Sequence, residues 1–374
     1  MGEKKRIGVL TSGGDCAGLN ATIRAIVNRA VVTYGWEVVG IKGATNGLMT
    51  TPPEYIDLHL SKVESLLTKG GTLLGTTNKG EKRLEECLDL IVENYHRLGL
   101  HALIGIGGDG SLAILHRIAK YGNINFVGIP KTIDNDVYLT EYAIGYQTAV
   151  NVATEALDRL HSTAESHERI MILEVMGRDA GHIALNAGIA GGAHIILIPE
   201  IPYNIENVCR KIAERKQHGF NHTVMIVSEA VYTRNGTCRV GKIGQFFADM
   251  ITELTGIDTR VTVLGHVQRG GMPSPADRIL ASSFGVAAVD LIAQENYNKI
   301  VAWQNHQVVP VPIEEATGKI RIVDPHDTLV KTAVGLGIYI GEHEGSLEIS
   351  HNGSGHPAQM FPLADSKILN ASIG

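Results

Sequence analysis

The sequence predicts an α/β fold in which helices cover both faces of a parallel sheet. Short, continuous apolar runs alternate along the chain with longer helical patterns. Glycine-rich turns follow several of these runs, as is common where a strand leads into a helix of an open α/β sheet. The length of 374 residues is enough for two domains.

The apolar runs predict strands, and the intervening amphipathic segments predict helices. The predicted strands are 7–10, 38–41, 102–106, 126–129, 170–175, 195–198, 224–227 and 261–264. The predicted helices are 20–33, 81–97, a segment from about 111, and 148–161. After about residue 342 the chain contains Gly, Ser, His and Asn without a helical stripe, and we expect an extended tail there.

The composition is that of a soluble globular protein, with 44% apolar and 19% charged residues. The formal net charge is −6 and the sequence has no basic stripe or tail, which argues against nucleic acid as the main partner. No run approaches transmembrane length, so we expect no membrane partner, and the charged amino terminus does not resemble a signal peptide. The four cysteines include no CxxC pair and indicate free thiols, so we expect a cytoplasmic protein.

The segment 130–136, with the sequence PKTIDND, follows the predicted strand 126–129. It places Lys131, Thr132, Asp134 and Asp136 at a strand tip, which is where ligands bind in open α/β sheets. Two carboxylates in this spacing suit a division of labour, with one taking a proton and the other holding a metal. The alternative is an Asx-rich turn, because Asp and Asn side chains cap their own backbone.

Two glycine-rich segments also join a strand to a helix: 11–20, TSGGDCAGLN, and 105–111, GIGGDGS. Glycines in such turns let backbone N–H groups approach a phosphate at a helix amino terminus. In the second segment, Asp109 is placed to hold Mg²⁺ directly or through water. Alternatively, Asp109 is only the N-cap of the following helix.

Two further motifs carry basic residues just after predicted strands, MGRDAGH at 176–182 and LGHVQRGG at 264–271. Arg178 could stabilise charge on a transferring phosphoryl group, and His266 with Arg269 could bind a phosphate. Arg169 and Arg260 each begin a strand-like run and are further candidates. The alternative for each arginine is a solvated side chain or a surface ion pair of little energetic value.

Taken in order, these motifs resemble those of the phosphofructokinase family, in its bacterial and plant-type branch, over residues 6–292. The resemblance implies an α/β fold of two Rossmann-like three-layer domains that face a cleft. It implies a donor-binding domain from 1–145 plus about 268–322. The sugar-phosphate-binding domain would be 146–267 plus about 323–345, and 346–374 would be the carboxyl-terminal tail.

The resemblance also implies catalytic roles. Asp134 would be the general base that takes the proton from the sugar 1-hydroxyl, and Thr132 and Asp136 would help hold that site and its metal. Gly14 would offer its backbone N–H to the transferred phosphoryl group. Arg178 would stabilise the charge of the transition state.

Binding roles follow from the same resemblance. The residues implied at the donor phosphates are Gly14, Gly108, Asp109, Gly110, Ser111 and Lys131, with Asp109 and Asp136 at Mg²⁺. The residues implied at fructose 6-phosphate are Met176, Gly177, Glu229, His266 and Arg269. Arg169 and Arg260 match arginines that reach this phosphate from a neighbouring subunit, which implies a homodimer or homotetramer with shared sites.

The implied reaction is the glycolytic transfer of a phosphoryl group from a nucleotide, with ATP favoured, to fructose 6-phosphate. Gly110 is the residue type found in family members that use a nucleotide as donor, whereas Lys131 is the type that accompanies pyrophosphate use. Asn78 stands where the allosteric bacterial enzymes carry an arginine. ADP or pyrophosphate is therefore the alternative donor. The chain could instead be a non-catalytic regulatory subunit or a kinase that acts on NAD or a lipid.

Overall fold

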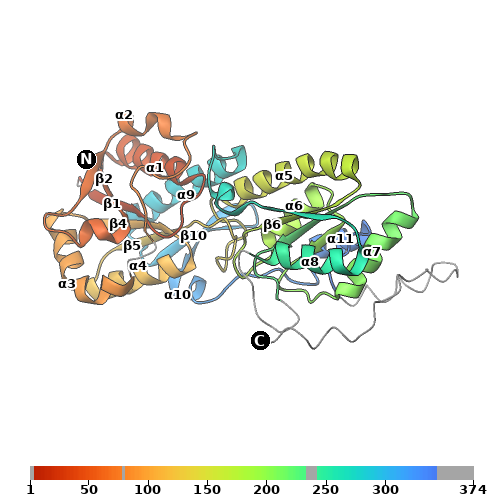
Figure 1. The fold of residues 1–374 in the computed structure, drawn as a ribbon. Helices are drawn as coiled ribbons and strands as arrows, with labels where there is room; N and C mark the ends of the chain where they lie inside the picture. Colours follow the sequence, from red (N-terminus) through yellow and green to blue (C-terminus); the bar gives the residue numbers. More distant parts are fainter. Residues whose placement is uncertain (1–3, 78–80, 233–241, 343–374) are drawn as a thin grey trace. The chain divides into compact units, whose positions relative to one another are not determined.

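The computed structural model describes residues 4–77, 81–232 and 242–342 (Figure 1). The chain forms two compact units, each built from a sheet and helices. Unit 1 comprises Met1–Ala153 and Gly265–Ile322, and unit 2 comprises Thr154–Leu264 and Val323–Gly374. The chain thus passes between the units at three places, and the predicted α/β class is confirmed.

Unit 1 contains a seven-stranded sheet in the order β11-β10-β5-β4-β1-β2-β3. The strands are β1 (Arg6–Thr11), β2 (Glu37–Ile41), β3 (Tyr55–Leu58), β4 (Ala102–Gly107), β5 (Phe126–Pro130), β10 (Lys299–Gln304) and β11 (Gln307–Pro312). The five inner strands pair in parallel, whereas β3 and β11 are antiparallel edge strands. The prediction of a parallel sheet is therefore correct for the centre of this sheet and wrong at its two edges.

Helices cover the sheet of unit 1 (Figure 1). They are α1 (Leu19–Asn28), η1 (Arg29–Thr33), η2 (Ala44–Leu48), α2 (Leu60–Val63), η3 (Glu64–Leu66), α3 (Glu81–Arg97), α4 (Asp109–Gly122), the start of α5 (Tyr146–His167), η4 (Gly265–Arg269), α9 (Pro275–Ala293) and α10 (Ile313–Ala316). Helices α3, α4 and α10 share one hydrophobic core with the sheet. Helix α9 packs closely on α1, because a Cβ on Gly285 would lie 2.7 Å from the Cβ of Ala25.

Unit 2 contains a four-stranded, fully parallel sheet in the order β7-β8-β6-β9. Its elements are the rest of α5, β6 (Ile170–Val175), α6 (His182–Ala190), β7 (Ile195–Leu197), α7 (Ile205–Gln217), β8 (Thr223–Ser228), α8 (Ile243–Thr255), β9 (Thr259–Val263) and α11 (Thr328–Gly335). Its core includes Ile172, Val227 and Phe247, each completely buried. The parallel sheet predicted from continuous apolar strands is confirmed here.

Local sequence signals set several helix ends. Ser274 caps α9 by accepting a hydrogen bond from the backbone N–H of Asp277, and Pro275 occupies the first turn. Asn204 caps α7 in the same way. Helix α8 ends at Gly256, whose φ of 68° lies in the left-handed region that glycine adopts without strain.

All eight predicted strands form, and the predicted helix 81–97 coincides with α3. The sequence pattern did not single out β3, β10 or β11. Pro310 and Pro312 in β11 are compatible with an edge strand, where a missing backbone donor costs little, but they weaken a strand signal in the sequence. Across the parts of the chain that the structure describes, no helix has the length and apolarity needed to span a bilayer.

Candidate active site

In unit 1, three loops meet at the carboxyl-terminal edge of the sheet. They follow β1, β4 and β5, which are adjacent in the order β5-β4-β1 and all parallel. The backbone N–H of Ser12 donates to the carbonyl of Ile106 (2.9 Å), and that of Lys131 donates to the carbonyl of Gly107 (2.9 Å). The three motifs that the sequence places after strands are therefore side by side, as the sheet topology requires.

Gly14 lies between two cationic side chains. The ammonium of Lys131 donates to the carbonyl oxygen of Gly14 at 2.5 Å. On the other side, a Cβ added to Gly14 would lie 2.9 Å from Nη1 of Arg269. A side chain at this position would displace the guanidinium, which is the mobile end of the Arg269 side chain. The structure brings together three residues that are distant in the sequence.

Lys131 is only 3% exposed, although it carries a charge. Its burial lowers the pKa of the ammonium, while nearby Asp134 and Asp15 act in the opposite direction. The hydrogen bond to Gly14 and the neighbouring carboxylates offset part of the desolvation cost. Lys131 therefore ties the loop after β5 to the loop after β1.

The loop 131–136 is held by its own side chains. The hydroxyl of Thr132 lies 3.2 Å from Oδ2 of Asp134 and accepts a hydrogen bond from the Asp134 backbone N–H (3.1 Å). Asn135 adopts a left-handed backbone, and its side chain donates to the carbonyl of Glu141 (3.0 Å). The hydroxyl of Thr132 thus closes this turn, and it lies beside the carboxylate of Asp134.

The end of the same loop is anchored by a residue that the sequence analysis did not identify. The backbone N–H of Arg321 donates to the carbonyl of Asp136 (2.8 Å), and its Nη1 donates to the carbonyl of Asn135 (3.3 Å). Asp136 itself is 5% exposed. Arg321 has no motif around it and lies 185 positions further along the chain, so no local signal could have revealed this contact.

The loop after β4 begins helix α4. Gly108, rather than Asp109, is the N-cap of α4, so the alternative interpretation of Asp109 as an N-cap is wrong. The carboxylate of Asp109 accepts a hydrogen bond from the backbone N–H of Gly318 at 3.0 Å. A Cβ on Gly110 would have no atom within 4 Å, so open space lies in front of this residue, and Ser111 follows in the first turn of α4.

Unit 2 has its own polar edge, at the carboxyl-terminal ends of β6 and β8. The backbone N–H of Arg178 donates to Oε1 of Glu229 at 3.0 Å, and the Arg178 side chain is exposed. Arg178 has a φ of 54°, and Gly177 before it has a φ of 147°. A left-handed backbone is uncommon for arginine and is found at functional sites. Met176 begins this loop and is half-buried.

Arg169 and Arg260 lie at the opposite edge of the unit 2 sheet. Arg169 immediately precedes β6, and Arg260 is near the start of β9, so about 20 Å of strand separates them from the loop after β6. Both pair with Asp258, through Arg169 Nε at 2.7 Å and Arg260 Nη2 at 3.2 Å. Within unit 2, the structure therefore does not bring these arginines together with Arg178 and Glu229.

His266 and Arg269 share the helical turn η4 in unit 1. Side chains three residues apart lie on the same side of a 3₁₀ turn. His266 is exposed, and Arg269 is half-buried against Gly14. The two side chains therefore lie on the same side of this turn.

A second supporting residue that the sequence analysis missed is Asp277. It is completely buried and accepts hydrogen bonds from the backbone N–H groups of Gly145 (2.9 Å) and Thr148 (2.7 Å). Burial raises the pKa of its carboxyl. Asp277 thereby joins the start of α9 to the start of α5. The sequence signal available was the pattern S-x-x-D at 274–277, which is a capping pattern.

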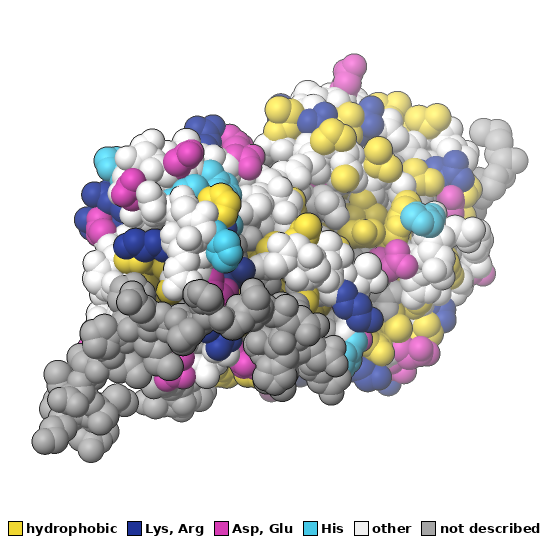
Figure 2. Space-filling model, turned by 90° about the vertical axis from the view of Figure 1, so that its right-hand side faces the viewer, with side chains coloured by type: hydrophobic (Ala, Val, Ile, Leu, Met, Phe, Trp, Pro, Cys, Tyr) yellow, Lys and Arg dark blue, Asp and Glu magenta, His cyan; other side chains and the backbone are white. Residues whose placement is uncertain are grey.

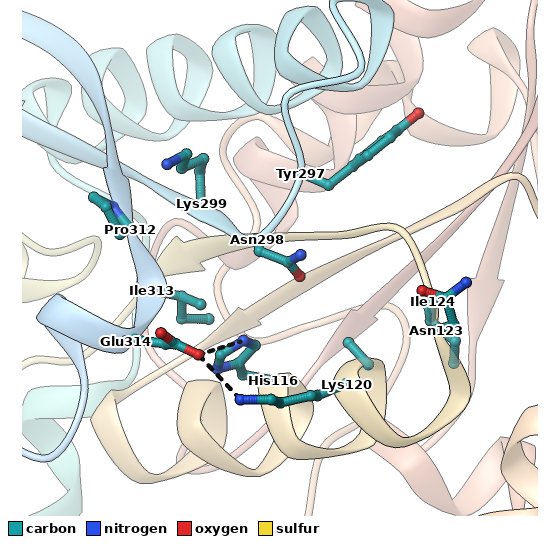
Figure 3. Close-up of a pocket in the computed structure, with 11 residues that line it drawn as sticks. His116, Lys120, Asn123, Ile124, Tyr297, Asn298, Lys299, Pro312, Ile313 and Glu314 are labelled. Atoms are coloured by element: carbon teal, nitrogen blue, oxygen red, sulfur yellow. Dashed lines mark hydrogen bonds and ion pairs between the residues drawn. The ribbon is translucent and has the colours of Figure 1, made fainter.

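A pocket of about 400 Å³ lies elsewhere in unit 1 (Figure 3). Its wall includes Ile124 and Asn298, which precede β5 and β10, so it lies at the amino-terminal side of these strands. Glu314 projects into it and pairs with Lys120 (3.4 Å) and His116 (4.0 Å). None of the predicted site residues lines this pocket.

On the face shown in Figure 2, lysine and arginine side chains alternate with acidic ones among the described residues and do not gather into one basic stripe. This agrees with the negative net charge. Asn78, which bears on the choice of donor, and the tail after 342 lie outside the residues that the structure describes.

Comparisons with known proteins agree with this arrangement. A family model described as Phosphofructokinase matches residues 6–292. The protein "ATP-dependent 6-phosphofructokinase 1" of Synechocystis sp. is 59% identical over 359 residues, covering 91% of this chain and 99% of that protein. "ATP-dependent 6-phosphofructokinase 2" of Nostoc sp. is 51% identical over 357 residues, with coverage of 91% and 99%.

Solved structures show the same similarity. Phosphofructokinase from Saccharomyces cerevisiae has a TM-score of 0.75 at 31% identity, covering 84% of this chain and 45% of the yeast chain. Pyrophosphate-dependent phosphofructokinase from Marinobacter aquaeolei has a TM-score of 0.77 at 20% identity, covering 97% and 98%, and shows the fold alone. The family match, the two close relatives and the shared motifs lead to one conclusion: this chain belongs to the phosphofructokinase family.

Proposed function

We propose that the chain is an ATP-dependent 6-phosphofructokinase, which transfers the γ-phosphoryl group of ATP to the 1-hydroxyl of fructose 6-phosphate in glycolysis. The observation that carries the proposal is the meeting of the loops after β1, β4 and β5 at one sheet edge. This arrangement groups a glycine loop, the start of α4 and the carboxylate of Asp134. The names of relatives that are 59% and 51% identical support ATP as the donor.

In this proposal Asp134 is the general base. It would take the proton from the attacking sugar hydroxyl, which makes the oxygen a better nucleophile as the bond to phosphorus forms. The Thr132 hydroxyl at 3.2 Å orients the carboxylate, and the buried turn around Asn135 keeps it in place. Phosphoryl transfer needs little covalent chemistry from a protein, so positioning of this kind is the main contribution of these residues.

The positive charge around Gly14 suits a transferred phosphoryl group. Lys131 donates to the Gly14 carbonyl, and the Arg269 guanidinium lies against the same residue. A glycine at this position lets the backbone N–H approach the phosphoryl oxygens closely. We assign the stabilisation of the developing charge to the Gly14 N–H in unit 1 and to the exposed Arg178 in unit 2.

The start of α4 would bind the donor phosphates. Gly108, Asp109, Gly110 and Ser111 form its first turn, where backbone N–H groups and the helix dipole favour anions. A Cβ at Gly110 would meet no atom within 4 Å, so no side chain crowds this position. This supports a nucleotide donor over pyrophosphate, while Lys131 is accounted for by its contact with Gly14.

Asp109 and Asp136 would hold Mg²⁺, the proposed cofactor. The donor set fits, because Mg²⁺ prefers carboxylate oxygens and keeps several waters. When bound, the ion would neutralise charge on the donor phosphates. The contact of Asp109 with the Gly318 N–H fixes its carboxylate at the start of α4, where the phosphates would lie.

Unit 1 would thus bind the donor, and unit 2 would supply the sugar contacts of Met176, Gly177 and Glu229. Glu229 accepts a hydrogen bond from the Arg178 backbone, which couples a sugar contact to the charge-stabilising residue. His266 and Arg269, on the same side of η4, would bind the 6-phosphate.

We further propose a homodimer or homotetramer with shared sites. Arg169 and Arg260 lie at the sheet edge opposite the Glu229 loop, which suits a role in the site of a neighbouring copy. Both are held by Asp258 and both are partly exposed. We place the reaction in the cytoplasm, in keeping with the free Cys16, Cys87 and Cys209.

The test is the substitution Asp134→Asn, which keeps the shape of the side chain and removes the base. We expect kcat to fall by about 10²–10⁴-fold with little change in KM or unfolding temperature. Asp249→Asn, an exposed residue of α8, is the matched control and should leave kcat unchanged. A kcat for Asp134→Asn within tenfold of the unsubstituted chain would contradict the assignment of the base.

A coupled enzyme assay of turnover identifies the phosphoryl donor. Purified chain with fructose 6-phosphate is given ATP, ADP or pyrophosphate in turn. Turnover with ATP well above turnover with the other two supports the proposal. If the purified chain alone shows no turnover with any donor and gains activity only with a partner chain, the non-catalytic subunit becomes the better interpretation.

A further inference from the structure

Three histidines gather at the amino-terminal edge of the unit 2 sheet. His194 and His222 directly precede β7 and β8, which are parallel neighbours with Ile195 opposite Met225, so the two histidines lie at the same end of these strands. His161 reaches the same place from helix α5. One ring nitrogen from each lies within 4.8 Å of the other two, and all three side chains are half-buried. This edge is opposite the one that carries Arg178 and Glu229. It also carries Arg169, because Ile170 of β6 is opposite Thr223 of β8, so the cluster adjoins a residue proposed to act in the site of a neighbouring copy.

The spacing of the rings is close to that of a three-histidine metal site. In a tetrahedral zinc site with Zn–N distances of about 2.0–2.1 Å, the nitrogens are about 3.3 Å apart and the ring centroids about 5 Å apart. Here the centroids are separated by 5.6 Å for His161–His194, 5.8 Å for His194–His222 and 6.4 Å for His161–His222. To bring the ring centroids to the separation of a tetrahedral zinc site, each ring would have to move by about 1 Å or less.

The hydrogen bond of His161 leaves a nitrogen available for an ion. Its Nε2 lies 2.8 Å from the carbonyl oxygen of Gly191, which can only accept, so Nε2 carries the proton and Nδ1 carries a lone pair. A ring N–H donated to a backbone carbonyl is the usual arrangement behind a metal-ligating histidine, because it fixes the tautomer and the ring orientation.

His194 is the ring that has to change its partner. Its Nδ1 accepts a hydrogen bond from the backbone N–H of Val224 at 2.9 Å, which puts the proton on Nε2. Ligation of an ion therefore displaces this proton or turns the ring over, and it weakens the contact with Val224. We expect the affinity to be lower than that of a fully pre-arranged site for this reason.

The charges around the cluster are mixed. Burial lowers the pKa of His194 to about 3, and the positive side chains of Arg215 and Lys211 on α7 act in the same direction. Glu165 acts on His222 in the opposite direction and lies one turn after His161 on α5. Its carboxylate is placed to compensate the charge of an ion, and water can complete the coordination.

We propose that His161, His194 and His222 form a binding site for one divalent transition-metal ion of the zinc class. Imidazole nitrogens favour Zn²⁺, Ni²⁺ and Cu²⁺ over Mg²⁺, so this site would not compete for the ion of the phosphoryl transfer. A bound ion would link α5 to the starts of β7 and β8. The proposal does not depend on the proposed catalytic function.

The test counts bound zinc. The full chain, free of any purification tag, is stripped with EDTA, desalted, incubated with excess ZnCl₂ at neutral pH and passed through a desalting column before elemental analysis. We expect the unsubstituted chain to hold one more zinc ion per chain than His161→Gln or His222→Gln. Glutamine at 161 keeps an N–H donor for Gly191, and His194 is left intact because of its contact with Val224.

His167→Gln is the matched control, because His167 is an exposed residue of the same helix outside the cluster. It should bind as much zinc as the unsubstituted chain. Zinc taken up by carboxylates elsewhere is common to all variants and cancels in the difference. Equal zinc content in the unsubstituted chain and in both cluster variants, each with an unchanged circular dichroism spectrum, would overturn the proposal.

Cobalt gives an independent readout. Co²⁺ bound by three imidazoles in a four-coordinate site absorbs in the visible range, whereas Co²⁺ held by exposed carboxylates and water absorbs weakly. We expect the visible bands in the unsubstituted chain and in His167→Gln, and their loss in His161→Gln and His222→Gln. Bands of the same strength in all four proteins would count against the cluster.

Discussion

Replacement of Asp277 tests how the start of α5 is held against α9. The carboxylate is completely buried and accepts from the Gly145 N–H (2.9 Å), the Thr148 N–H (2.7 Å) and the Thr148 hydroxyl (2.5 Å). The Ser274 hydroxyl lies at 3.5 Å. In Asp277→Ala these buried donors lose their acceptor, and water has no access to replace it.

The size of the effect follows from the number of donors left unpaired. Each buried backbone N–H without a partner costs about 1–3 kcal/mol, so the two N–H groups of Gly145 and Thr148 together cost about 2–6 kcal/mol. For a unit of this size, a loss of 1 kcal/mol lowers the unfolding temperature by about 2–4 °C. We therefore expect Asp277→Ala to melt roughly 10 °C below the unsubstituted chain.

The assay is thermal unfolding followed by circular dichroism and by calorimetry at neutral pH. The unfolding temperature of Asp277→Asn should fall less than that of Asp277→Ala, because the amide oxygen of asparagine still accepts a hydrogen bond. It should still fall, because the amide nitrogen is itself a donor and faces the donors that the second carboxylate oxygen had accepted from. Asp290→Ala is the control on the same helix. Asp290 is partly exposed and accepts hydrogen bonds from Arg29 (2.7 and 3.0 Å) and from the Tyr34 hydroxyl (2.9 Å), groups that water can reach, so its loss should cost about 1–2 kcal/mol, less than the loss of Asp277. If Asp277→Ala melts within about 2 °C of the unsubstituted chain, the reasoning from unpaired donors is refuted.

Two further predictions concern the glycine loop. In Gly14→Ala the new Cβ lies 2.9 Å from Nη1 of Arg269 and displaces the guanidinium, so steady-state kinetics should show kcat/KM reduced by at least about tenfold. The control Gly335→Ala, whose Cβ meets no atom within 4 Å, should leave kcat/KM unchanged. Equal kcat/KM values for the two variants would contradict the prediction. Burial raises the pKa of Cys16 from 9.0 to about 12, so above pH 9 the unfolded chain ionises this thiol while the folded chain does not. Stability should therefore fall with rising pH by up to about 1.4 kcal/mol per pH unit more in the unsubstituted chain than in Cys16→Ala, measured by denaturant unfolding between about pH 9 and 11. Parallel pH profiles of the two proteins would show that the thiol ionises equally in both states.

Much of the fold was predictable because its signals are local. A continuous apolar run predicts β1, β4 and β5, followed by a glycine turn after β1 and β4 and by Pro130 after the run 126–129, and the helical period of 81–97 coincides with α3. The edge strands β3 and β11 were missed, since an edge strand is only partly buried and its pattern is weak. The inner strand β10, which pairs with both β11 and β5, was missed as well. The antiparallel pairing at both edges of the unit 1 sheet likewise has no counterpart in the local pattern.

The candidate site divides in the same way. The motifs identified Gly14, Asp109, Asp134 and Arg178 from residue type and position after a strand. No motif indicated that Arg321 would hold the 135–136 carbonyls or that Asp277 would join two helices. Such supporting contacts join residues more than a hundred positions apart, and their partners are backbone atoms that every residue possesses.

The sequence by itself determined the α/β class, the positions of the central strands along the chain and the residue types at each strand tip, because strand and turn signals depend on neighbouring residues. Only the tertiary structure decided that Lys131 is buried on the Gly14 carbonyl and that Arg269 lies against the same glycine. It also decided that His161, His194 and His222 share one corner of unit 2. These contacts depend on which strands are adjacent in the sheet, and adjacency is set by the packing of the whole unit rather than by any local run of residues.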